Sequence, residues 1–182
     1  MSAPARGTLL GDRVLVMDRE EARRLFASGF FGKPLGVPKP RGTEFDEPLA
    51  LDLFEARYLS ESGLLEIRDE GGRAVGRAAL RRRCALSDPY FEEKYRVYRD
   101  LRNSGYVVGA GIKFGSDFAV YERGPGIDHA PFLVHVLKSS DQLTANYIVL
   151  AGRLATAVRK KFVLAVAGRR RTRYLAFEWW RP

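Results

Sequence analysis

Tyr121, His129 and Lys160 are three side chains in the second half of the chain that could together cleave a phosphodiester bond. Tyr121 ends an apolar run, His129 follows eight residues later in a polar stretch, and Lys160 comes 31 residues after His129, at the end of a helical pattern. Cleavage of RNA by its own 2′-hydroxyl needs a base, an acid and a cation beside the phosphorane. These residue types suit that reaction if they meet at one edge of a sheet. Singly, each also fits a plainer role, as a strand aromatic, a loop histidine or a helix-terminal cation.

Two short motifs accompany these residues. Lys113-Phe-Gly-Ser-Asp-Phe118 precedes the tyrosine, and Val158-Arg-Lys-Lys-Phe162 contains the lysine. Together with His129, eight residues after Tyr121, these motifs resemble the catalytic domain of the tRNA-intron endonucleases. The resemblance covers most of residues 87–182, and Gly29-Phe-Phe-Gly32 and the segment 51–58 are similar to the N-terminal domain of that family.

The resemblance implies an archaeal endoribonuclease that uses Tyr121 as base, His129 as acid and Lys160 as the stabilising cation. It also implies products with 2′,3′-cyclic phosphate and 5′-hydroxyl ends, and neither metal nor other cofactor. Lys161 competes with Lys160, which matches the family lysine when the motif is superposed. His135 lies inside an apolar strand pattern, which favours a structural role.

Further residues are candidates for binding RNA. Arg153 precedes Lys160 by seven residues, two helical turns, which predicts nearly the same helix face. In the family, an arginine there stacks on a base flipped out of a bulge, and an aromatic or a second arginine from the last strand covers its other side. Alternation from Tyr174 favours Trp179 over Trp180 as that aromatic. Packing in the core is the alternative role for either tryptophan.

A proline- and glycine-rich segment, residues 30–48, predicts a long basic loop. It resembles an insertion of the crenarchaeal branch of the family, in which a loop lysine touches RNA. Lys39 lies between two prolines, so we expect it, more than Lys33 or Arg41, to contact a phosphate. A solvated surface charge is the alternative.

Charge and composition restrict the kinds of partner and the kinds of site that we expect for this chain. The 182 residues carry a net charge of +9, of which +2 falls on residues 1–86 and +7 on residues 87–182, so we expect a polyanionic partner at the second half. Cys84, the one cysteine, excludes an internal disulfide and a cysteine-based zinc site. Without a long apolar run or a signal peptide, the chain is expected in the cytoplasm, away from membranes.

The element pattern predicts an α/β (α+β) fold in two small domains, residues 1–86 and 87–182, the second with a central mixed sheet flanked by helices. Arginines and small residues at 77–83 are interpreted as the connection between them. In the first domain we predict a strand at 11–17, a helix at 19–28, a buried helix from 49 to near 63 and short strands around Gly71-Gly72. In the second we predict helices near 88–104 and 140–159, and strands at 106–112, 118–121, 131–137, 162–167 and 174–180.

The resemblance also bears on partners: precursor tRNA with a bulge–helix–bulge, and other subunits. Assembling chains of the family place acidic residues near the position that Gly168–Arg173 occupies here, and this segment is strongly basic. We therefore expect a separate structural subunit in an α2β2 heterotetramer, ahead of a homotetramer. The competing functions are a non-catalytic subunit, an RNA-binding module and a metal-dependent nuclease using Asp117 and Lys113.

Overall fold

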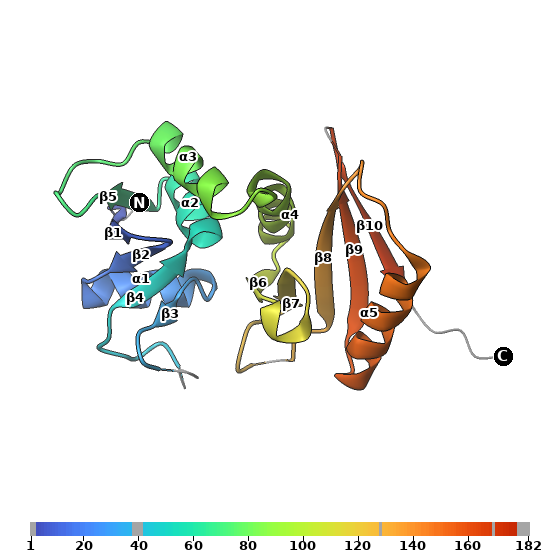
Figure 1. The fold of residues 1–182 in the computed structure, drawn as a ribbon. Coiled ribbons are helices and arrows are strands. Elements are labelled where there is room, and N and C mark those ends of the chain that lie inside the picture. Colours follow the sequence, from blue (N-terminus) through green and yellow to red (C-terminus); the bar gives the residue numbers. More distant parts are fainter. Residues whose placement is uncertain (1–2, 38–41, 128, 169, 178–182) are drawn as a thin grey trace. The chain divides into compact units, whose positions relative to one another are not determined.

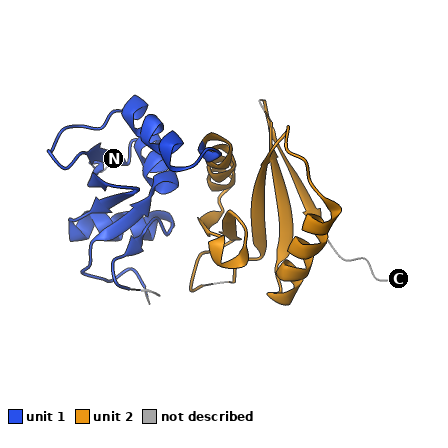
Figure 2. Ribbon diagram, in the orientation of Figure 1, with its two compact units in different colours: residues 1–91 blue, residues 92–182 orange. Residues whose placement is uncertain are grey.

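The computed structural model describes residues 3–37, 42–127, 129–168 and 170–177. It contains two compact units, Met1–Phe91 and Glu92–Pro182, each with a five-stranded sheet and helices (Figures 1 and 2). The predicted α/β (α+β) fold in two domains is confirmed. None of the helices among the described residues is long and apolar enough to cross a bilayer.

The sheet of the first unit has the order β3-β4-β2-β1-β5, in which only β1 and β5 pair in parallel. Residues 11–17 were predicted as one strand, and the structure shows instead the second half of a hairpin that turns at Gly11, where φ is 58°. The first half was missed because Ala-Arg-Gly-Thr-Leu-Leu lacks a clear alternation. The strands are β1 (Ala5–Leu10), β2 (Arg13–Val16), β3 (Lys33–Pro34), β4 (Leu49–Asp52) and β5 (Leu65–Arg68).

Helices α1 (Arg19–Gly29), α2 (Leu53–Glu61) and α3 (Arg77–Ser87) complete this unit. The prediction of α1 is confirmed, and Asp18 caps it by accepting a hydrogen bond from the Glu21 amide at 2.9 Å. The carboxylate of Glu21 does not return the bond as a capping box requires, because it accepts from the Arg6 amide at 2.8 Å. The α1 helix is thereby connected to β1.

Three predictions for this unit were wrong, wholly or in part. The buried helix expected from residue 49 is divided between β4 and α2, whose start is fixed by a capping box of Asp52 and Glu55. An apolar run does not distinguish a buried strand from a buried helix. Residues 77–83 belong to α3, which buries Leu80 and Cys84 one turn apart. Of the short strands predicted around Gly71-Gly72, β5 is present before the turn, whereas after it the described residues show only a single bridge, between Ala74 and Arg68.

The described part of the loop 30–48 is attached to α1. The Phe45 ring is buried and meets Phe26 edge-on at 5.5 Å. Arg23 donates to the Phe45 carbonyl and pairs with Glu44 and Asp46 at 2.9 and 3.0 Å. Acidic residues within the loop thus bind it to the helix before it.

The sheet of the second unit has the order β10-β9-β8-β7-β6, with β8 and β9 parallel and the other pairs antiparallel, which confirms the predicted mixed sheet. The α5 helix begins after the Thr144 cap and ends at Ala157, so it is shorter than the expected 140–159. The elements are α4 (Phe91–Asn103), β6 (Val107–Ala110), a 3₁₀ turn (Ile112–Phe114), β7 (Phe118–Tyr121), β8 (Phe132–Lys138), α5 (Ala145–Ala157), β9 (Lys161–Ala167) and β10 (Thr172–Phe177).

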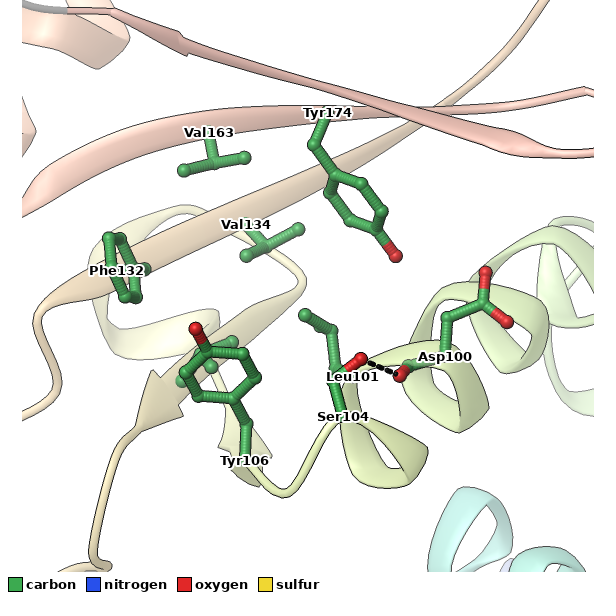
Figure 3. Close-up of a pocket in the computed structure, with 9 residues that line it drawn as sticks. Asp100, Leu101, Ser104, Tyr106, Phe132, Val134, Val163 and Tyr174 are labelled. Carbon is green, nitrogen blue, oxygen red and sulfur yellow. Dashed lines mark hydrogen bonds between the residues drawn. The ribbon is translucent and has the colours of Figure 1, made fainter.

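One face of this sheet is directed toward α4. The side chains of Val120, Val134 and Val163 lie on it and form the floor of an open cavity of about 270 Å³ (Figure 3). Asp100 and Leu101 of α4 line its edge together with Tyr174 of β10.

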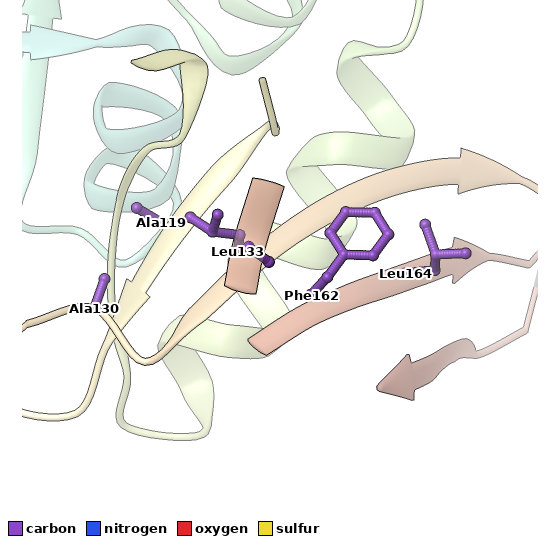
Figure 4. Packing of buried hydrophobic residues seen from close by; sticks show 6 residues of the cluster. Ala119, Ala130, Leu133, Phe162 and Leu164 are labelled. Atoms are coloured by element: carbon purple, nitrogen blue, oxygen red, sulfur yellow. The ribbon is translucent and has the colours of Figure 1, made fainter. Parts of the chain in front are cut away.

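The opposite face packs on α5 through buried hydrophobic side chains, five of which are labelled in Figure 4. Its core cluster consists of Ala119, Ala130, Leu133, Ala155, Phe162 and Leu164. Two leucines of α5, Leu150 and Leu154, are directed away from this core and are 68% and 41% exposed. The helix packs on the sheet through Tyr147, Ala151 and Ala155.

Candidate active site

The register of three neighbouring strands brings Tyr121 and Lys160 to the same end of the sheet. Val120 of β7 pairs with Phe132 of β8, and Phe132 pairs with Lys161 of β9. At the next position toward that end, Tyr121 at the end of β7 is aligned with Pro131, just before β8. Pro131 is in turn aligned with Lys160, just before β9. Two strand spacings separate the outer backbones by about 10 Å. Tyr121 packs against the core cluster and so lies on the α5 face.

Lys160 is held at this end by a sharp change of chain direction after α5. Arg159 adopts a left-handed conformation with φ of 55°, and the Lys160 amide closes the turn on the Ala155 carbonyl at 2.8 Å. The Lys160 ammonium donates to the Ala130 carbonyl at 2.6 Å and lies 5.3 Å from the centre of the Phe114 ring. Lys161 is exposed and begins β9, where alternation directs it to the other face.

His129 precedes Ala130 in the connection from β7 to β8, and its side chain is exposed. Ala130 itself is buried, and its carbonyl accepts the Lys160 hydrogen bond. The residue next to His129 is therefore fixed to Lys160. The structure thus places all three sequence-predicted residues at one end of β7, β8 and β9.

His135 belongs to a separate network around Asp117. The Asp117 carboxylate lies 3.0 Å from His135 Nδ1 and 2.9 Å from Lys94 Nζ, and it accepts from the Val136 amide at 2.8 Å. Burial alone would raise the pKa of Asp117, but the hydrogen bonds from His135, Val136 and Lys94 hold it below its ordinary value. Within the described part of the chain, no three His, Cys, Asp or Glu side chains are grouped as a metal site.

Comparison with known proteins shows to which family the chain belongs. A model of the catalytic C-terminal domain of tRNA intron endonucleases matches residues 91–174, and a model of the N-terminal domain of the same enzymes matches residues 5–81. The chain belongs to the tRNA intron endonuclease family. The enzyme thus carries both domains of the family, and its residues 91–174 match the model of the catalytic one.

Curated relatives extend this similarity over nearly the whole enzyme. A tRNA-splicing endonuclease from Hyperthermus butylicus is 56% identical over 179 residues, which is 97% of this chain and 99% of the relative. Proteins of the same name from Sulfolobus acidocaldarius and Saccharolobus solfataricus are 40% and 38% identical, covering 95% and 94% of this chain and 97% and 96% of their own length.

The RNA-binding candidates of the enzyme are only partly described. Arg153 is exposed on α5, but the helix ends before Lys160, so the seven-residue spacing does not place both on one helix face. That reasoning was wrong because the left-handed Arg159 turns the chain into β9. Lys33 is exposed on β3. Lys39, Arg41, Trp179 and Trp180 lie outside the described residues.

Two features of the enzyme were missed from sequence. One is the cavity under α4, where burial and the nearby Asp100 raise the pKa of Tyr174 to about 12 (Figure 3). Its lining comes from separate elements, so no local motif indicates it. The other is the pair of groups that contact Lys160, the Phe114 ring and the Ala130 carbonyl. The sequence did contain a signal for both groups, because Phe114 belongs to the motif before Tyr121 and Ala130 directly follows His129.

Proposed function

We propose that this chain is a catalytic subunit that cuts precursor tRNA at the exon–intron junctions of a bulge–helix–bulge. The observation that carries the proposal is the gathering of Tyr121, His129 and Lys160 at one end of β7, β8 and β9, with the Lys160 ammonium bonded to the residue after His129. These residues supply a base, an acid and a cation, the set that internal cleavage of RNA requires.

In the proposed reaction, the Tyr121 phenolic oxygen removes the proton of the 2′-hydroxyl, and the 2′-oxygen attacks the adjacent phosphorus. The bond from phosphorus to the 5′-oxygen breaks, and His129 donates its proton to that leaving oxygen. Lys160 stabilises the negative charge on the phosphorane between these steps. The products are a 2′,3′-cyclic phosphate and a 5′-hydroxyl, without a metal ion in any step.

The two protonation states follow from ordinary side-chain chemistry. Histidine titrates near neutral pH, so it can carry the proton that the leaving oxygen needs. Tyrosine ordinarily titrates near pH 10, so it acts as a base only where nearby positive charge favours the phenolate. Lys160, two strands away on the same sheet end, is such a charge.

Substrate binding in this proposal uses one arginine, one tryptophan and one lysine in addition to the three catalytic residues. Arg153 stacks on the flipped bulge base, Trp179 covers its other side, and Lys39 of the long loop binds phosphate. Phosphate contacts add affinity with little sequence information, whereas stacking holds the base in place.

The proposed assembly is an α2β2 heterotetramer in the cytoplasm with a separate structural subunit. Arg170, Arg171 and Arg173, in and beside the turn between β9 and β10, are all exposed. An acidic docking loop cannot be formed by this basic turn, so the partner would supply it. A homotetramer remains the second form of the proposal.

The test is to express the chain alone and with candidate structural subunits, and to incubate each preparation with bulge–helix–bulge RNA in excess chelator. Sequencing and end-group analysis of the products should give cuts at both junctions with cyclic phosphate ends. Cleavage that stops in chelator would support a metal-dependent nuclease instead. Binding without cleavage in every combination would support a structural subunit or an RNA-binding module.

A further inference from the structure

The Lys160 ammonium is oriented by two uncharged groups. It donates to the Ala130 carbonyl at 2.6 Å and lies 5.3 Å from the centre of the half-buried Phe114 ring. Among the described residues, no carboxylate forms an ion pair with it. An ammonium group has three N–H donors, so a carbonyl and a ring face leave one N–H for another acceptor.

An aromatic ring differs from a carboxylate as a partner for this cation. Both attract an ammonium group, but the ring does so through its quadrupole and carries no net charge to neutralise the lysine. The full positive charge is therefore retained for a phosphate. Phe114 is therefore suited to orient the Lys160 ammonium without reducing its net charge.

The turn that presents Phe114 is tightly constrained. The Phe114 amide donates to the Gly111 carbonyl at 2.8 Å, and Gly115 ends the turn with φ of 64°. A Cβ at Gly111 would lie 2.6 Å from the Ser116 hydroxyl and 2.7 Å from the Phe118 backbone, so only glycine fits there. The position of the ring is thus determined by the backbone.

Asp117 attaches this turn to the sheet. Its carbonyl accepts from the Gly111 amide at 3.0 Å, and its own amide donates to Val134 of β8 at 3.1 Å. Its carboxylate binds Lys94 and the Val136 amide. The ring therefore has a fixed place relative to β8, whose preceding residues include Ala130 and His129.

We propose that Phe114 is a positioning residue for Lys160. Its ring and the Ala130 carbonyl hold the ammonium so that the remaining N–H is directed to the reacting phosphate. The Ala130 bond also fixes the distance between the cation and the backbone that carries His129. This inference rests on the proposed role of Lys160 in cleavage.

The first experiment compares Phe114→Leu with Phe114→Tyr in the active assembly. Leucine fills the space without a π face, whereas tyrosine retains one. Single-turnover cleavage at saturating enzyme should be roughly 5- to 30-fold slower for Phe114→Leu, from the loss of a partly desolvated cation–π contact, and within about 2-fold of normal for Phe114→Tyr. RNA affinity should stay unchanged for both.

Phe177→Leu is the matched control, because Phe177 packs against the same cluster through Phe162, at 6.1 Å between ring centres, whereas the ring that lies over the Lys160 ammonium is that of Phe114. Thermal unfolding of each variant shows whether it is folded. If Phe114→Leu fails to fold, Phe114→Met and Phe114→Trp make the same comparison of a filled space without and with a π face. Equal rates for the aromatic and non-aromatic variants would overturn the inference.

A double-mutant cycle with Lys160→Met then separates the inference from the function it rests on. If Phe114 acts through Lys160, Phe114→Leu should have no further effect once the ammonium is gone. If the rate reductions of the two single variants multiply in the double variant, the positioning role is overturned and the catalytic proposal stays intact. A normal cleavage rate for Lys160→Met alone would refute the proposed role of Lys160, and with it this inference.

Discussion

Lys94 Nζ lies 2.9 Å from Oδ1 of Asp117, which joins α4 to the residue that precedes β7. The same carboxylate binds His135 and the Val136 amide of β8. Asp117 is thus a structural anchor between a helix and two strands, and its side chain is only 13% exposed.

Replacing Asp117 by Asn should destabilise the protein by about 2–4 kcal/mol at neutral pH, because Lys94 loses its buried partner. Although burial opposes it, the hydrogen bonds to the Asp117 carboxylate hold its pKa in the folded state below its ordinary value. Its contribution is therefore complete above about pH 4 and disappears as the pH falls through the lowered folded value. Chemical denaturation across pH 2–7 measures this. Asp12→Asn, which removes an exposed carboxylate, should show little change, and equal losses for both variants would contradict the role of Asp117.

His129→Ala should slow cleavage by roughly 10²–10⁴ while leaving RNA affinity nearly intact, because the leaving 5′-oxygen loses its acid. Single-turnover rates and a binding titration on the same RNA separate the two quantities. His135→Ala is an informative comparison, since His135 lies in the Asp117 network: its effect should be on stability. A parallel loss of binding in His129→Ala would mean that His129 holds substrate.

Arg153→Ala should weaken binding to bulged RNA by about 1–3 kcal/mol, the usual contribution of stacking on one base, and should affect an unbulged duplex less. Arg99→Ala removes another exposed arginine, on α4, and serves as the charge-matched control. Titrations of both RNAs with both variants measure the difference. Equal weakening on bulged and unbulged RNA would assign Arg153 a general phosphate contact.

Lys39→Ala should weaken RNA binding and reduce the salt dependence of affinity by about one unit, because one phosphate contact is removed. Cleavage of non-standard bulge substrates should decline most. Lys33→Ala, on β3 in the same segment 30–48, provides the control that the hypothesis requires, since Lys39 is expected to contribute more. Unchanged rates on standard and relaxed substrates across a salt series would rule out this contact.

Residue types and spacing identified the family, the mixed sheet of the second domain and the three candidate catalytic residues. Local chemistry was sufficient where a capping residue specifies the start of a helix, as at Asp18. It was insufficient for the apolar run at 49–59, because burial on all sides gives the same pattern for a strand and a helix.

The tertiary structure alone decided how the three candidate catalytic residues come together. No spacing along the chain reveals that Val120, Phe132 and Lys161 are in register, which aligns Tyr121 with Lys160 across β8. The left-handed Arg159 likewise moves Lys160 off α5 and against Ala130 and Phe114. Strand register and the direction of a chain after a helix depend on contacts between residues far apart in sequence, so a local pattern cannot specify them.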